Sequence, residues 1–153
     1  MRPTAFCLLE HNGRLLLQEF WHEHDHYHFY RPPGGGIEHG ELARDAIRRE
    51  MREELNVDIQ EPELLTVLEN IFDYGGETKH EIVFLFRATL HDERITGVPE
   101  VQILDNTFTF RAVWQPIDVL LREEVLLYPV ELQKRLPEFF PEMKWADSPG
   151  VPG

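Results

Sequence analysis

Three glutamates close together on one predicted helix most restrict what this 153-residue chain can fold into. Residues 41–55 contain no Gly or Pro and many strong helix formers, so they are predicted to be helical. Glu50 and Glu54 are neighbours four residues apart, and Glu53 lies beside them near the helix C-terminus. Like charges at this spacing cost a few tenths of a kcal/mol, and the helix dipole disfavours negative charge there. A multivalent cation would reverse both penalties, so we expect the function to reside at this end of the helix.

The helical wheel indicates that the acidic residues share a face with apolar ones. With ~100° between successive residues, Ala46 and Ile47 fall in the same sector as Glu50 and Glu54, and Glu53 lies at its edge. The stripe therefore begins apolar and ends acidic. Oxygen ligands of this kind suit a hard divalent cation such as Mg²⁺, which takes a few carboxylates together with waters and substrate phosphates.

The segment before the helix is predicted to be a loop. Residues 32–36 comprise two prolines and three glycines, which interrupt regular structure and let backbone groups approach a phosphate or a metal closely. Arg49 lies four residues before Glu53 and is expected to orient it by a salt bridge. Glu41, in the first turn, interacts favourably with the helix N-terminus.

The remaining pattern predicts one α/β (α+β) domain over residues 1–146, with a Pro- and Gly-rich flexible tail at 147–153. Strands are predicted at 4–9, 14–20, 64–73, 81–90 and 108–114, short helices after Pro116 and over 129–136, and a loop over 91–106. Asn12-Gly13 predicts a hairpin between the first two strands. The continuously apolar run 82–86 predicts a strand in the interior of the sheet.

Charge and cysteine content limit the partners and the compartment. The formal charge is −13, from 28 acidic and 15 basic residues, so the chain's field repels polymeric nucleic acid. Cys7 is the one cysteine, which excludes an intrachain disulfide and a thiolate metal site and favours a cytoplasmic location. No apolar stretch approaches the ~18 residues of a membrane span, so no membrane partner is expected.

Four histidines, His22, His24, His26 and His28, alternate with other residues, a spacing that would align them on one side of an extended strand. Imidazoles bind zinc or nickel, so a metal site is one hypothesis. Strand-aligned histidines converge poorly, however. We favour an exposed, aromatic-rich approach to the active site.

The spacing from residue 35 to residue 57 resembles the Nudix box, GX5EX7REUXEEXGU, where U is a bulky apolar residue. The matching positions are Gly35, Glu41, Arg49, Glu50, Met51, Glu53, Glu54 and Val57. Asn56 departs from the pattern, which has Gly there. Because Asn tolerates the left-handed conformation, we expect a slightly weaker helix cap and unchanged chemistry.

The resemblance implies a Nudix fold, a mixed β-sheet sandwiched between helices, and an enzyme that hydrolyses a nucleoside diphosphate linked to another moiety X. It implies that Glu50, Glu53 and Glu54 bind Mg²⁺ or Mn²⁺ together with the Gly35 carbonyl. A homodimer is common among similar proteins.

It also implies that Glu41 and Arg49 hold the loop and helix in place. A carboxylate accepts the proton of the attacking water. Glu53 is favoured as this base, Glu50 is second, and Glu81 is the candidate outside the box.

Substrate contacts are predicted from position. Phe29, Tyr30 and Arg31 precede the glycine loop, where rings could stack on a base and Arg31 could pair with a phosphate. Tyr74, in a predicted turn, is a further candidate. The main alternative function is a Nudix-fold sensor or scaffold that binds a nucleotide without cleaving it. Cleavage of capped RNA is a second alternative, which the negative charge disfavours.

Overall fold

The computed structural model describes residues 1–22, 26–105 and 108–145. The strands are β1 (Arg2–His11), β2 (Arg14–His22), β3 (Tyr27–Arg31), β4 (Gly34–Gly36), β5 (Glu63–Tyr74), β6 (Glu77–Thr89), β7 (Glu100–Asp105) and β8 (Phe108–Pro116). The helices are α1 (Ala43–Leu55), α2 (Glu93–Thr96), α3 (Val130–Lys134) and α4 (Leu136–Phe139), with a 3₁₀ turn at Ile117–Val119.

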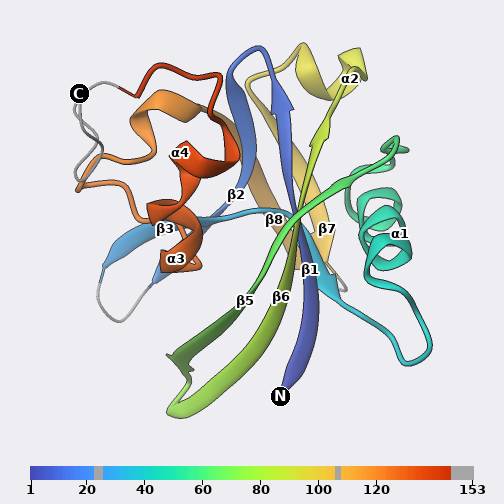
Figure 1. Ribbon diagram of the computed structural model, residues 1–153, viewed down its shortest axis with the longest axis vertical. Helices are drawn as coiled ribbons and strands as arrows, with labels where there is room; N and C mark the ends of the chain where they lie inside the picture. The colour runs from blue at the N-terminus through green and yellow to red at the C-terminus, as the bar shows by residue number, and fades with distance from the viewer. Residues whose placement is uncertain (23–25, 106–107, 146–153) are drawn as a thin grey trace.

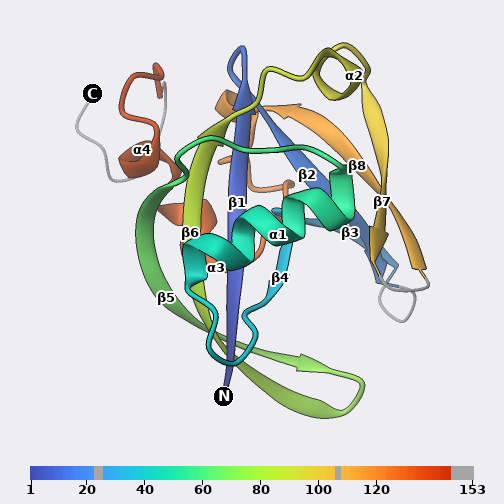
Figure 2. The same ribbon diagram turned by 90° about the vertical axis from the view of Figure 1, so that its right-hand side faces the viewer.

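The strands form one mixed sheet in the order β5-β6-β1-β2-β8-β7, with β4 paired to β1 and β3 paired to β2. The β1–β6 pair is parallel and the other pairs are antiparallel. Helix α1 covers one face of the sheet, whereas α3 and α4 cover the other (Figures 1 and 2). This arrangement confirms the predicted mixed sheet sandwiched between helices.

Strand β1 is buried on both faces because it is interior to the sheet. Its side chains alternate between two cores: Cys7 and Leu9 pack on the α1 side, and Phe6 and Leu8 pack on the side of α3 and α4. Strand β6 is also paired on both sides, as the apolar run 82–86 predicts.

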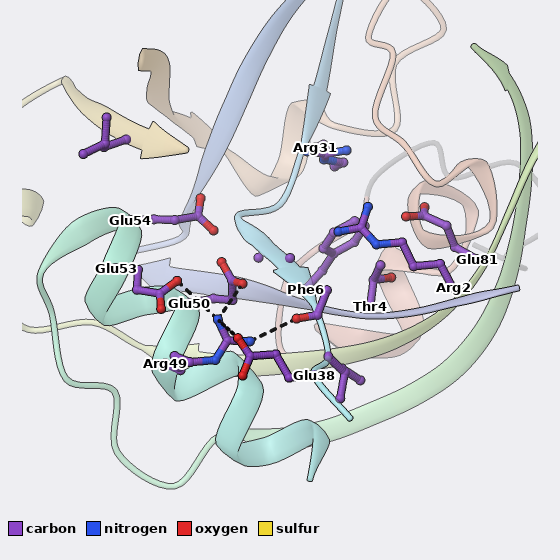
Figure 3. Close-up of a pocket in the computed structure, with 15 residues that line it drawn as sticks. Arg2, Thr4, Phe6, Arg31, Glu38, Arg49, Glu50, Glu53, Glu54 and Glu81 are labelled. Carbon is purple, nitrogen blue, oxygen red and sulfur yellow. Dashed lines mark hydrogen bonds and ion pairs between the residues drawn. The ribbon is translucent and has the colours of Figure 1, made fainter. Parts of the chain in front are cut away.

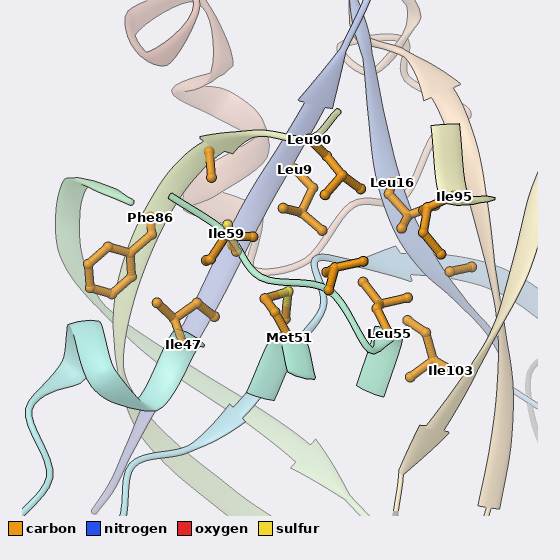
Figure 4. Packing of buried hydrophobic residues seen from close by; sticks show 14 of the residues in the cluster. Leu9, Leu16, Ile47, Met51, Leu55, Ile59, Phe86, Leu90, Ile95 and Ile103 are labelled. Atoms are coloured by element: carbon orange, nitrogen blue, oxygen red, sulfur yellow. The ribbon is translucent and has the colours of Figure 1, made fainter. Parts of the chain in front are cut away.

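Helix α1 is fixed to the sheet by the apolar half of its surface. Ile47, Met51 and Leu55 are buried, and they pack among sheet residues such as Leu9 and Ile103 (Figure 4). This packing fixes the rotation of α1 about its axis, and with it the direction in which the glutamates project.

The glycine segment is not the loop that its composition predicts. Gly34, Gly35 and Gly36 form β4 and pair with residues 4–6 of β1. A Cβ on Gly34 would lie 2.0 Å from the Ala5 carbonyl oxygen, so glycine lets this backbone approach β1 where another residue would clash. The prediction of a loop was wrong because a close approach between strands needs a partner that the local sequence does not reveal.

The predicted loop at 91–106 was also wrong. This region contains α2, in which the Asp92 side chain accepts a hydrogen bond from the Arg94 backbone N–H, and β7. Strand β7 pairs with β8 through neighbours such as Ile103 and Phe110. Its stability comes from this pairing and from burial of Ile103, neither of which is visible in the charged local sequence.

The histidines do not lie along one strand. β2 ends at His22, His26 has a positive φ of 53°, and His28 lies on the antiparallel strand β3. The predicted common alignment was therefore wrong, because the segment turns back on itself. His24 lies outside the described residues. Within the described ranges, no group of three His, Cys, Asp or Glu side chains is arranged to hold a metal ion.

Smaller differences concern element ends. The long helix begins at Ala43 rather than Glu41, and β6 begins at Glu77, so Glu81 lies within the strand rather than at its start. The expected tail at 147–153 is outside the described residues. In the part of the chain that is described, no helix is long and apolar enough to cross a membrane.

Candidate active site

Arg49 connects the segment before α1 to the acidic end of the helix. Its Nε and Nη2 donate to the two carboxylate oxygens of Glu41 at 2.8 and 2.9 Å, and Nη2 also donates to the Gly36 carbonyl at 3.0 Å. Its Nη1 donates to Glu50 at 3.0 Å and to Glu53 at 3.2 Å. The arginine therefore holds four parts of the site together, and Figure 3 shows its contacts with Glu50 and Glu53.

The charges of Arg49 and Glu41 stabilise each other. Hydrogen bonding to Arg49 is the main cause that lowers the pKa of the Glu41 carboxyl, and the backbone N–H of Glu38 adds to it. Hydrogen bonding to Glu41, with the charge of Glu50, raises the pKa of Arg49. Both side chains therefore remain charged at neutral pH.

The three box glutamates differ in their access to solvent. The side chain of Glu53 is 58% exposed and that of Glu50 is 14% exposed, whereas Glu54 is buried. All three line one pocket, as the wheel predicts for the acidic part of the helix face. The chain then leaves the helix through Asn56, which caps it in the left-handed conformation at φ 55°.

Gly35 brings the backbone of β4 directly beneath Glu50. A Cβ at this position would lie 2.6 Å from Glu50 Oε1, so a larger residue would displace that carboxylate. Since Gly35 also pairs with Ala5 of β1, the backbone is anchored to the sheet below the acidic end of α1.

The pocket has a volume of about 590 Å³ and lies between α1, β4 and the N-terminal half of β1. Its charged lining is Arg2, Arg31, Glu38, Arg49, Glu50, Glu53, Glu54 and Glu81. Figure 3 shows the carboxylates of α1 and the Arg2 side chain on opposite sides of this pocket. The arrangement suits an elongated anionic ligand whose charge is neutralised by cations at the acidic side.

Glu81 is brought to the pocket from a distant part of the sequence. It is buried, and its Oε1 accepts a hydrogen bond from the Asn70 amide at 3.3 Å. Glu81 is therefore not a surface residue. Sequence reasoning did not identify Asn70, since its pairing with Glu81 depends on the register between β5 and β6.

Of the residues predicted to contact the substrate, only one lines the pocket. Arg31 lines the pocket, but Phe29, Tyr30 and Tyr74 are not among its lining residues. Phe29 stacks on Phe20, with ring centroids 5.1 Å apart.

Tyr30 and Tyr74 lie away from the pocket for different reasons. The backbone of Tyr30 bonds to Leu126 and Tyr128, so this residue holds the C-terminal segment against β3. Tyr74 is 69% exposed at the end of the β5–β6 hairpin. Tyr30 directly precedes Arg31 on β3, so the alternation of side chains along a strand places its ring on the opposite face from Arg31.

The donor chemistry of the acidic side fits a hard divalent cation. Carboxylates at a helix end, above a glycine backbone that leaves room for close approach, are oxygen ligands of the type that Mg²⁺ takes. Because Glu50 and Glu53 are turned towards Arg49, the box glutamates are not arranged as a ready-made metal site among the described residues. Binding of a metal ion would require these carboxylates to exchange this arginine for the ion.

Comparison with known families is consistent with this arrangement. A family model described as NUDIX domain matches residues 1–143. The chain belongs to the Nudix family. Nudix hydrolases generally hydrolyse nucleoside diphosphate derivatives and generally use divalent metal ions. The chain is therefore a member of the Nudix hydrolase family.

Solved structures of Nudix proteins have the same fold. The dihydroneopterin triphosphate pyrophosphohydrolase of E. coli matches with a TM-score of 0.64 and 17% identity, covering 92% of this chain and 96% of its own. The MutT protein of Bacillus halodurans matches with a TM-score of 0.63 and 20% identity over 89% of this chain and 80% of its own. The MutT Nudix hydrolase of Burkholderia pseudomallei has a TM-score of 0.62 and 21% identity over 86% and 94%.

Proposed function

We propose that this Nudix protein catalyses Mg²⁺- or Mn²⁺-dependent hydrolysis of the pyrophosphate bond in a small nucleoside diphosphate derivative. The observation that supports this most strongly is the acidic end of α1, held by Arg49 above Gly35 and facing a pocket that also contains Arg31. In this proposal Glu50, Glu53, Glu54 and the Gly35 carbonyl hold the metal.

In this proposal the residues of the site have different roles. Glu41 and Arg49 hold helix α1 and strand β4 in fixed positions relative to each other. When bound, the metal neutralises pyrophosphate charge and lowers the pKa of a water molecule. Glu53 accepts the proton of the attacking water, whose oxygen forms a bond to one phosphorus while the bridging P–O bond breaks. The greater exposure of Glu53 supports it over Glu50 and the buried Glu81 as the base.

The test is turnover of a panel of nucleoside diphosphate derivatives with Mg²⁺. We expect Glu53→Gln to lower kcat by about 10²–10⁴-fold, because the amide cannot accept the proton. Glu54→Gln should lower activity and raise the Mg²⁺ concentration needed for half-maximal rate. Asp45→Asn, an exposed position in the first turn of the same helix, is the matched control and should retain activity.

Full turnover by both glutamine variants would contradict the assigned mechanism. Absence of turnover for every compound, together with tight nucleotide binding, would instead support the sensor or scaffold. The crowding of Glu50, Glu53 and Glu54 at one end of the helix argues against the sensor, because like charges at this spacing are costly and a non-catalytic binder has no need of them.

The cellular location, the oligomeric state and the partners of the protein stay predictions from the sequence. A cytoplasmic location and a homodimer are both part of the proposal, as is the absence of a polymeric nucleic acid partner. Size-exclusion chromatography with light scattering measures the assembly directly, and a purely monomeric protein at micromolar concentration would contradict the dimer.

A further inference from the structure

The turn between β1 and β2 places a carboxylate beside a backbone nitrogen that can react with the chain itself. Asn12 and Gly13 form this turn, which lies at the opposite end of β1 from the N-terminus (Figure 1). We propose that Asn12 is a site of spontaneous deamidation, in which its side chain is converted to aspartate or isoaspartate with Glu10 as the base. This inference is independent of the proposed hydrolysis, because it involves none of the residues that line the pocket.

Deamidation needs an asparagine side chain and the backbone nitrogen of the next residue. The chain contains four asparagines, and Asn12 is the one that precedes a glycine. Glycine leaves its nitrogen unshielded because it has no side chain. Asn56 and Asn70 precede Val57 and Ile71, whose branched side chains crowd the same approach. The sequence therefore singles out Asn12 and provides two internal comparisons.

The backbone of the turn is open. Asn12 has a φ of 50° and Gly13 a φ of 75°, as expected when both central residues of a two-residue hairpin turn are left-handed. Asn12 is exposed to solvent. A Cβ on Gly13 would meet no heavy atom of the described chain within 4 Å. The neighbourhood therefore leaves room for the five-membered ring that the reaction forms.

The carboxylate of Glu10 contacts the nucleophile. The backbone N–H of Gly13 donates to Glu10 Oε1 at 3.3 Å. An amide nitrogen is a poor nucleophile until its proton is removed, and a carboxylate within hydrogen-bonding reach is positioned to accept that proton. Glu10 is thus placed to act as the base of the reaction.

The leaving nitrogen also has a partner on β1. His11 Nδ1 lies 3.0 Å from the Leu90 carbonyl oxygen, so this ring nitrogen carries the hydrogen and donates it. His11 Nε2 then accepts a hydrogen bond from Asn12 Nδ2 at 3.2 Å. The attacking and leaving nitrogens are therefore each bonded to a side chain next to the turn.

The proposed reaction consumes one water molecule and releases ammonia. Glu10 takes the proton of the Gly13 nitrogen, and this nitrogen forms a bond to Cγ of Asn12. The Cγ–Nδ2 bond breaks, and the departing nitrogen takes a proton from water and leaves as ammonia. Glu10 returns its proton to the hydroxide that remains. Water then opens the succinimide at one of its two carbonyls, which gives aspartate or isoaspartate.

Either product changes the junction at the centre of the sheet. Strands β1 and β2 pair with each other next to the turn, through Glu10 with Leu15 and through His11 with Arg14. Aspartate adds a negative charge close to Glu10. Isoaspartate adds a carbon atom to the backbone of a turn whose length sets the strand register. We therefore expect the modified protein to melt at a lower temperature than the unmodified one.

The first test is peptide mapping by mass spectrometry after the folded protein has been incubated in mildly alkaline buffer at physiological temperature. The peptide that contains Asn12 should gain the mass that results from replacing –NH₂ by –OH, and an isoaspartate-specific methyltransferase should label it. The peptides that contain Asn56 and Asn70 should stay unchanged. Asn12→Gly keeps a left-handed turn and should abolish the change in this peptide. An Asn12 peptide that stays unmodified would overturn the proposal.

A second comparison isolates the role of Glu10. Glu10→Gln keeps an oxygen acceptor for the Gly13 N–H but removes the base, so it should slow deamidation of the folded protein at least about tenfold. In denaturing urea the two proteins should react at nearly the same rate, because the contact is lost. Glu63→Gln, exposed at the start of β5, is the control for loss of a surface carboxylate and should react like the wild type.

Calorimetry establishes that each variant is folded before its rate is measured. The folded wild type should react at least as fast as its own unfolded chain. An unchanged rate in folded Glu10→Gln would overturn the assignment of the base. A folded wild type that reacts more slowly than the unfolded chain would show that the turn protects Asn12, and would overturn the proposal as a whole.

Discussion

Five hydrogen bonds leave the guanidinium of Arg49, and they reach residues that are up to thirteen positions away in the sequence. A lysine could not replace this network, because its ammonium lacks the planar fork that bonds both oxygens of Glu41. At the scale of single residues, the acidic cluster is thus held by one basic side chain.

The Glu41–Arg49 pair predicts a pH dependence of stability. Because the pKa of Glu41 is lowered in the folded protein, the pair's contribution is fully present above the ordinary carboxyl pKa of 4.5 and is lost as pH falls through the lower folded value. Glu41→Gln should lower the free energy of unfolding by about 1–3 kcal/mol at pH 7, since Arg49 loses its main partner. Urea denaturation at pH 7, 5, 4 and 3 should show the gap from the wild type narrowing below about pH 4.5.

Glu138→Gln is the matched control, because this exposed carboxylate also pairs with an arginine, Arg135, away from the site. We expect a much smaller change there, since exposed pairs contribute little. A gap between Glu41→Gln and the wild type that stays constant down to pH 3 would contradict the role assigned to the pair.

At the scale of elements, helix α1 combines a buried apolar face with an acidic end, and its C-cap determines where the chain leaves the site. Asn56 occupies the left-handed region, its backbone N–H donates to the Arg52 carbonyl, and the Val57 N–H donates to the Met51 carbonyl. This is the conformation expected of Asn in place of the family's Gly, and the substitution keeps the cap.

The cap gives a second stability prediction. Asn56→Gly should keep or slightly raise the free energy of unfolding, because glycine enters the left-handed region without a steric penalty. Asn56→Ala should lower it by about 1 kcal/mol, since alanine bears that penalty without asparagine's local hydrogen bonding. Chemical denaturation of both variants measures the difference. Equal stability of the two would show that the left-handed cap does not limit the helix.

The elements around the site also explain the errors of prediction. The box could be recognised from the sequence because one helix and its two ends set the spacing from Glu41 to Val57. The periodicity of a helix depends only on local sequence. Strand β4 and strand β7 were not readable, because each exists through pairing with a strand far away in the sequence. Phe29 and Arg31 share a strand, yet only Arg31 reaches the pocket, since sheet curvature and packing decide which side chains meet it.

At the scale of the whole molecule, the formal charge of −13 dominates the long-range electrostatics. Repulsion among the excess carboxylates opposes the compact state, and salt screens it with a Debye length of ~10 Å at 0.1 M. We therefore expect the melting temperature to rise between ~10 mM and ~0.5 M NaCl. A steady fall over that range, measured by calorimetry in a fixed buffer, would indicate that attractive ion pairs outweigh the net repulsion.

The sequence by itself determined the family, the acidic helix and the residues of the box. A helix positions its side chains with a fixed period along the chain, so their relative placement follows from the local sequence. It did not determine that Arg2, Glu81 and Arg31 share a pocket with those glutamates. That depends on the parallel pairing of β1 with β6 and on the contact of β4 with β1. Strand register is set by packing over the whole sheet, so only the tertiary structure decided which side chains face the acidic end of α1.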